Sequence, residues 1–126
     1  MLPKIFVLAS LPVASLWQKM LAGACDVETV RHTDGEPNVR HAFHTVGSDA
    51  DIRHVVVVTH KKVCPETCRV IGLAARQGKP TTIITIPDHE PGLAEQAAEI
   101  GARFFSSPLD REAVRTLALS GIAARN

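Results

Sequence analysis

Four consecutive valines, Val55 to Val58, constrain the fold of this chain more than any other feature. A short unbroken β-branched run bounded by polar residues predicts a strand buried on both faces, as strands of parallel sheets are. Pro65 then predicts the first turn of a helix and Gly78 its end, because proline costs nothing at that turn and glycine favours a helix terminus. A second β-branched run, residues 81–86, completes a right-handed strand–helix–strand crossover.

The remaining sequence continues the same alternation of strands and helices. We predict strands over residues 4–8, 27–30 and 103–105, and helices over residues 12–21, 36–46, 93–100 and from Asp110 onward, with Asp110 as the N-cap of the last one. A turn is expected at residues 33–35. Helical periodicity places two sets of side chains inward, namely Val13, Leu16, Trp17, Met20 and Leu21 in the first helix and Val39, Ala42, Phe43 and Val46 in the second. On the second helix His41 and His44 point outward.

Five strands that alternate with five helices predict a single α/β domain over residues 1–126. Its five-stranded parallel sheet has strand order 2-1-3-4-5 and carries helices on both faces, in three layers. In such sheets ligands bind where strands end, which here means Thr59, His60 and Thr85.

Composition excludes several classes of function. Charge is balanced, with 14 Lys and Arg against 13 Asp and Glu, which argues against direct nucleic-acid binding. No apolar run approaches the roughly 20 residues of a membrane span. Three cysteines give no disulfide framework and indicate a cytoplasmic protein. No nucleotide-binding fingerprint and no nucleophilic triad spacing is present, so we predict neither an enzyme nor a bound cofactor.

With the strands in this order, the chain resembles the receiver domains of two-component response regulators, which have a flavodoxin-like fold. Val7 to Pro12 is similar to the family's first strand and loop, with Ala9 and Ser10 where two acidic residues normally stand. The valine run ends at Thr59, where the resemblance places the phosphoacceptor aspartate. Thr85 matches the family's Thr or Ser that contacts the phosphoryl group. Ser107-Pro108-Leu109-Asp110 resembles the family's Lys-Pro-Phe-Asp, with Ser107 in place of the lysine.

The departures from the family pattern agree with one another. Phosphorylation needs a carboxylate nucleophile and magnesium, a hard cation that is held mainly by oxygen ligands and above all by carboxylates. Ala9, Ser10 and Thr59 supply no carboxylate. The resemblance therefore implies a degenerate pseudo-receiver, a phosphorylation-independent module that acts through protein contacts, either alone or as the regulatory domain of a longer transcriptional regulator.

An alternative from another class is a metal, redox or small-molecule sensor built on the corner formed by His60, Cys64 and Cys68. Their spacing of four residues differs from that of a typical zinc site, and buried cysteine behaves as a small hydrophobe. We therefore expect Cys64 and Cys68 to belong to the core, together with Ile71 and Ala75. A metal cluster of His32, His41 and His44 is a weaker alternative. Lys61 and Lys62, before the helix, are interpreted as solvated.

The last helix has a candidate protein-binding surface. Ala113, Val114, Leu117, Ala118 and Gly121 share the side predicted to face the sheet. Leu119 lies nearly opposite, with Ile122 beside it. Because the resembled family often dimerises through its last helices, we predict a homodimer or a docked protein partner at Leu119 and Ile122.

Overall fold

The computed structural model describes residues 2–85, 89–106 and 110–123, without the side chains of residues 120–123. In these ranges β1 (Lys4–Leu8), β2 (Asp26–Thr29), β5 (Ile52–Val58), β6 (Thr81–Thr85) and β7 (Arg103–Ser106) form one parallel sheet in the order β2-β1-β5-β6-β7. This is the predicted order 2-1-3-4-5, and the fold prediction is confirmed. No described helix has the length and apolar character needed to cross a bilayer.

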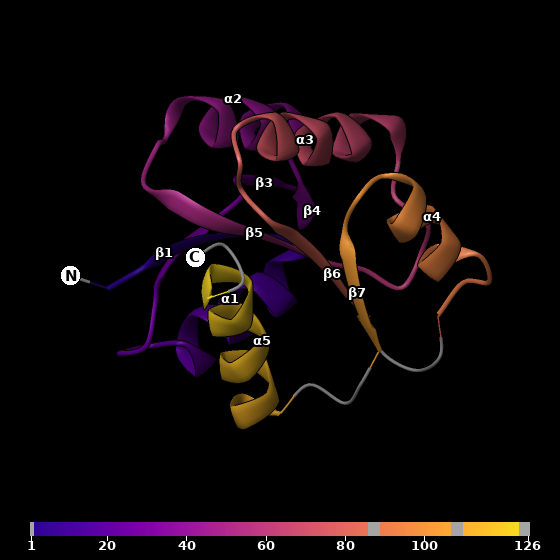
Figure 1. The fold of residues 1–126 in the computed structure, drawn as a ribbon. Helices are drawn as coiled ribbons and strands as arrows, with labels where there is room; N and C mark the ends of the chain where they lie inside the picture. The colour runs from indigo at the N-terminus through magenta and orange to yellow at the C-terminus, as the bar shows by residue number, and fades with distance from the viewer. Residues whose placement is uncertain (1, 86–88, 107–109, 124–126) are drawn as a thin grey trace.

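Helices cover both faces of the sheet (Figure 1). The helices are α1 (Leu11–Met20), α2 (Val39–Ser48), α3 (Pro65–Arg76), α4 (Leu93–Glu99) and α5 (Arg111–Ala123). The alternating side chains of β1 and β5 divide the apolar interior in two. Phe6 and Val55 pack with α2, α3 and α4, whereas Ile5 and Val56 pack with α1 and α5. Burial on both faces explains why the valine run has no polar alternation.

A two-stranded hairpin between β2 and α2 was not predicted. Strands β3 (His32–Thr33) and β4 (Glu36–Pro37) pair antiparallel around Asp34 and Gly35, whose φ angles are 54° and 80°. Two consecutive positive φ values give the tight turn that joins short antiparallel strands, and Asp-Gly supplies them at low cost. The turn prediction is confirmed, but the predicted start of α2 at Glu36 is wrong because that residue belongs to β4.

Helix α2 begins after Asn38, whose side-chain Oδ1 accepts a hydrogen bond from the backbone N–H of His41 at 3.1 Å. Its buried residues are Ala42, Thr45 and Val46. Phe43, predicted inward, is 42% exposed. Thr45 takes a buried position instead because its hydroxyl lies 3.2 Å from Nε2 of His41 and so keeps a polar partner.

The buried faces of α1 and α3 also differ from the prediction. Trp17 in α1 and Leu21 directly after it are buried as expected, but Leu16 is 46% exposed and Ala14 is buried instead. In α3 the buried residues are Thr67, Val70, Ile71 and Ala74, so only Ile71 of the predicted set is correct. The predicted apolar face of α3 was rotated by about one residue, or 100°.

Candidate functional site

The carboxyl edge of the sheet brings together Thr59 and Thr85, which were predicted from strand ends, and Ser10, which the receiver resemblance placed there. Ser10 follows β1, Thr59 follows β5 and Thr85 ends β6, and all three line one pocket of about 460 Å³. Ala9 lies beside them, only 3% exposed, with no oxygen on its side chain. Ser107 lies outside the described residues. The pocket therefore stands where ligands bind in open parallel sheets, but with hydroxyl groups at its strand ends.

Several pocket residues were not expected from the sequence. Glu36 and Pro37 come from the hairpin, Lys61 from the loop after β5, and Thr67 from the first turn of α3. The full lining is Leu8, Ser10, Val13, Glu36, Pro37, Val57, Val58, Thr59, His60, Lys61, Val63, Thr67 and Thr85. The Asp-Gly turn was the sequence signal for the hairpin, but nothing in the sequence indicated that the hairpin folds over the sheet edge.

The hairpin wall is held by contacts to the β1–α1 loop. Nε2 of His32 lies 2.7 Å from the backbone carbonyl of Ala9, and because that oxygen only accepts, this ring nitrogen carries the proton. The backbone N–H of Leu11 donates to the carbonyl of Gly35 at 3.2 Å. These contacts fix the hairpin over the start of α1.

The opposite wall is a closed turn after β5. The Thr59 hydroxyl donates to the carbonyl of Lys61 at 3.0 Å and accepts from the N–H of Lys61 at 3.1 Å. The next N–H, of Lys62, donates to Oε2 of Glu90 at 2.7 Å, and the N–H of Glu90 donates to the carbonyl of His60 at 2.7 Å. The Thr59 hydroxyl thus uses its hydrogen and one lone pair within its own turn.

A second clamp ties this loop to α4. The backbone N–H of Val63 donates to Oε1 of Gln96 at 2.9 Å, and Nε2 of Gln96 donates back to the carbonyl of Val63 at 3.0 Å. One side-chain amide therefore satisfies both backbone groups of a loop residue, as a neighbouring strand would. The pocket wall and α4 form one hydrogen-bonded unit.

The corner formed by His60, Cys64 and Cys68 differs from the prediction. Cys64 is the exposed N-cap of α3 and Cys68 is only half-buried, so placing Cys64 in the core was wrong. Sγ of Cys64 lies 3.3 Å from Oγ1 of Thr67, which lets a threonine occupy the buried face. Burial raises the pKa of the Cys68 thiol, with a further increase from the nearby Cys64.

Neither proposed metal cluster is assembled in the part of the chain that the structure describes, where no three His, Cys, Asp or Glu side chains are grouped to hold an ion. His44 is exposed, as predicted. His41 is half-buried rather than outward, because its Nδ1 accepts a hydrogen bond from the N–H of Arg31 at 3.1 Å. His32 is engaged by Ala9.

A fully buried histidine that the sequence reasoning did not single out lies at the centre of the sheet. Nδ1 of His54 is 2.9 Å from the carbonyl of Ala118 in α5, and Nε2 is 2.7 Å from Oγ1 of Thr82 in β6. The carbonyl requires a proton on Nδ1, so Nε2 accepts from the threonine. Burial above all, together with the positive charge of Arg103, lowers the pKa of His54 to about 4, although the hydrogen bond to Ala118 acts in the opposite direction.

The predicted interface residues are placed only in part. Leu119 is 40% exposed on α5, while Val114 and Ala118 on the opposite side are buried, so the predicted phase of this helix is confirmed. The side chain of Ile122 lies outside the described residues. The N–H of Ala113 donates to Oδ1 of Asp110 at 2.8 Å, which confirms Asp110 as the helix cap.

No protein-family model and no curated protein sequence matches this chain. Solved structures do match it over nearly its whole length. A response regulator receiver protein from Sinorhizobium medicae superposes with a TM-score of 0.73 at 17% identity, covering 99% of this chain and 98% of the other. The chain has the receiver-domain fold. The signal receiver domain of a modulated diguanylate cyclase from Desulfovibrio desulfuricans gives a TM-score of 0.75 at 14% identity, with 99% and 97% covered.

A third similar structure is the signal receiver domain of a putative Luxo repressor protein from Vibrio parahaemolyticus. It has a TM-score of 0.70 and 13% identity, with 99% of this chain and 93% of the other covered. Two of these three similar structures thus come from proteins described as a putative repressor and as a diguanylate cyclase. At these identities the likeness concerns the fold alone, and the site must be interpreted from its own residues.

Proposed function

We propose that residues 1–126 form a pseudo-receiver, a non-catalytic and phosphorylation-independent regulatory domain that works through protein contacts in the cytoplasm. The observation that carries the proposal is the chemistry at the strand ends, where Ala9, Ser10 and Thr59 provide no carboxylate. A phosphoryl acceptor of the receiver type needs a carboxylate nucleophile, and its magnesium ion needs carboxylate ligands. The Thr59 hydroxyl already donates its hydrogen to the carbonyl of Lys61 and accepts from the N–H of the same residue.

Amide spectra recorded with magnesium and beryllofluoride test this proposal. We expect no shifts at Thr59 or Thr85, because neither the metal nor the phosphoryl analogue finds its ligands. Clear shifts at these two residues would refute the proposal. The double variant Ser10→Asp/Thr59→Asp serves as the control, since both positions line the pocket, and we expect magnesium-dependent shifts to appear in it.

We further propose that α5 carries the protein-binding surface, with Leu119 at its centre and Ile122 beside it. Exposed leucine on a helix whose inner face is already packed is compatible with a homodimer or a docked protein. The Leu119→Arg variant should keep its fold because Val114 and Ala118 hold the core face, and its mass in analytical ultracentrifugation should fall to that of the monomer. Thr116→Arg, at an exposed position of the same helix, is the matched control. A wild-type chain that is monomeric at high concentration would exclude self-association.

The similar domain from a repressor protein supports a place for this chain within transcriptional regulation. With nearly balanced charge, this domain is expected to bind no DNA by itself. Fluorescence anisotropy with a random-sequence duplex at moderate salt measures this directly. Tight, salt-dependent binding by the isolated chain would contradict the assignment of a regulatory rather than a DNA-contacting role.

A further inference from the structure

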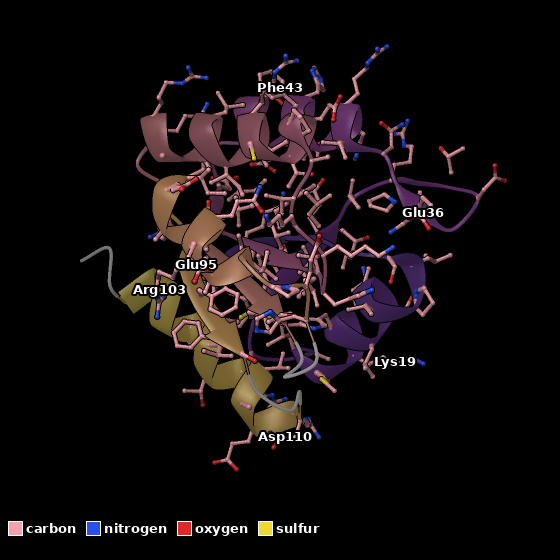
Figure 2. The ribbon with its side chains drawn as sticks, turned by 90° about the vertical axis from the view of Figure 1, so that its right-hand side faces the viewer. Lys19, Glu36, Phe43, Glu95, Arg103 and Asp110 are labelled. Carbon is pink, nitrogen blue, oxygen red and sulfur yellow. The ribbon has the colours of Figure 1, made fainter. Side chains whose placement is uncertain are left out.

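The pocket at the carboxyl edge combines an apolar floor with charges of both signs at its rim. Leu8 and Val57 are nearly fully buried beneath it. Glu36 from the hairpin and Lys61 from the β5–α3 loop are both exposed at its mouth. Figure 2 shows Glu36 on the hairpin that extends over α1. The volume of about 460 Å³ lies within the range of about 300–1,000 Å³ in which small molecules bind.

Both walls are formed before any ligand arrives. The hairpin is held through His32 and Gly35, and the β5–α3 loop through Glu90 and Gln96. Binding to such a pocket costs little ordering of the chain, because the backbone of both rims is already fixed. The charged ends of Glu36 and Lys61 are therefore supported by well-defined backbone.

Two other hollows lined by described residues lack this combination. The cavity of about 290 Å³ at the opposite end of α3 contains Lys79, whose Nζ donates to the carbonyls of Val46 and Asp49. The hollow of about 450 Å³ beside α5 has only the acidic charges of Asp110 and Glu112.

A third hollow, of about 330 Å³, contains Glu66 with Arg40 and Arg69, but its apolar lining is the half-buried Val39 and the exposed Phe43 rather than a buried floor. The pocket at the carboxyl edge pairs opposite charges with a buried aliphatic surface.

We propose that this pocket binds a small aliphatic α-amino acid as a zwitterion. Glu36 pairs with the ammonium group, Lys61 pairs with the carboxylate, and the aliphatic side chain covers the floor at Leu8 and Val57. A phosphate or a simple carboxylate would leave Glu36 opposing its charge, and an amine alone would leave Lys61 unmatched. The inference rests on the proposed loss of phosphorylation, which leaves the pocket available to a different ligand.

The test is a titration of the full chain with L-leucine and L-valine, followed by amide spectra. We expect shifts at Ser10, Thr59 and Thr85 with at least one of the two. Two analogues of leucine each lack one charge: 3-methylbutylamine has no carboxylate and 4-methylpentanoate has no amine. Each should bind at least about tenfold more weakly than L-leucine, because one rim charge loses its partner.

Charge variants locate the binding mode. Glu36→Gln should weaken L-leucine about tenfold or more and leave 4-methylpentanoate unaffected or tighter, whereas Lys61→Gln should weaken L-leucine and leave the amine unaffected. Lys19→Gln is the matched control, since Lys19 is exposed at the far end of α1 from the hairpin (Figure 2). All three positions are exposed, so the variants should fold.

Two results would overturn the inference. One is that neither L-leucine nor L-valine causes shifts at concentrations up to about 10 mM, well above the roughly 1 mM dissociation constant of a weak complex. The other is binding that survives both Glu36→Gln and Lys61→Gln. If neither the amino acids nor beryllofluoride shift the amide signals, only the ligand proposal is refuted. If beryllofluoride shifts them, the proposed loss of phosphorylation is refuted.

Discussion

Protonation of His54 should destabilise this protein in mildly acidic solution. The imidazole is 0% exposed and neutral, with its pKa lowered from 6.5 to about 4 by burial and then by Arg103, which pairs across from Thr82 in the sheet. Between pH 6.5 and 4 the unfolded chain binds a proton at this residue and the folded chain does not. Stability is therefore complete above pH 6.5 and is lost as the pH falls toward 4.

The size of the effect follows from the difference between the two pKa values. A difference of about 2.5 units at about 1.4 kcal/mol per unit gives roughly 3–4 kcal/mol lost across this interval. That is a large part of the roughly 5–15 kcal/mol that stabilises a typical domain. Asp49, whose pKa is lowered mainly by its hydrogen bond to Lys4, contributes a loss of the same sign at still lower pH.

Urea unfolding at a series of pH values from 7.5 to 4, followed by the fluorescence of the buried Trp17, measures this loss. The control is His54→Gln, which offers an amide N–H and a carbonyl oxygen but cannot be protonated. We expect the variant to be less stable at pH 7.5 and nearly independent of pH in this interval. Equal slopes for the two proteins between pH 6.5 and 4 would refute the buried, neutral state of His54.

Two further substitutions test single contacts. Lys79→Met should lower the free energy of unfolding by about 1–3 kcal/mol, because the carbonyls of Val46 and Asp49 lose a charged donor. The control Lys19→Met should change it by less than about 0.5 kcal/mol, and urea unfolding measures both variants. Asp110→Ala should cost about 1 kcal/mol and Asp110→Asn much less, because asparagine can still accept from the N–H of Ala113; thermal unfolding that treats both variants alike would contradict the cap.

The parallel sheet could be predicted because its signals are strong and independent of one another. The run from Val55 to Val58 reports burial on both faces, and Pro65 and Gly78 mark the ends of α3 without reference to tertiary contacts. Leu119 was placed correctly because the apolar residues of α5 repeat with a helical period. Local rules and the global fold agree at these positions, which is the condition under which sequence reasoning succeeds.

The errors in the buried faces of α2 and α3 arose where a polar residue occupies a buried position by means of a specific partner. Thr67 replaces Cys64 inside α3 because the two side chains contact each other, and Thr45 replaces Phe43 in α2 because of His41. Hydrophobic periodicity counts such threonines as exposed and so rotates the predicted face. A hydrogen bond between particular atoms leaves no trace in a pattern of apolar residues.

The site was predicted in part for a related reason. Strand ends are readable from the sequence, so Thr59, His60 and Thr85 were expected at one edge, and all three line the pocket. Glu36 was not expected there, because strands β3 and β4 have two residues each and show no alternation. Its position depends on the bond from His32 to Ala9, a contact across 23 residues that no local signal encodes.

We expect the Gln96 clamp to couple the pocket to α4 rather than to α5. Gln96→Ala leaves the N–H and carbonyl of Val63 without their partner, so we expect a loss of about 1–3 kcal/mol from two half-buried hydrogen bonds. The stability of Gln96→Glu should lie between that of the wild type and that of Gln96→Ala, because a carboxylate accepts from the N–H of Val63 but cannot donate to its carbonyl. Amide hydrogen exchange in the Gln96→Ala variant should speed up in α4 and stay unchanged in α5, which has no hydrogen bond to this loop among the described contacts.

If L-leucine binds at Lys61, its binding should slow hydrogen exchange in α4 of the wild type, and this slowing should be absent in Gln96→Ala. Equal slowing of α4 and α5 would mean that the effect of binding spreads through the sheet instead, and the clamp would then be a local support rather than the link from the pocket to α4.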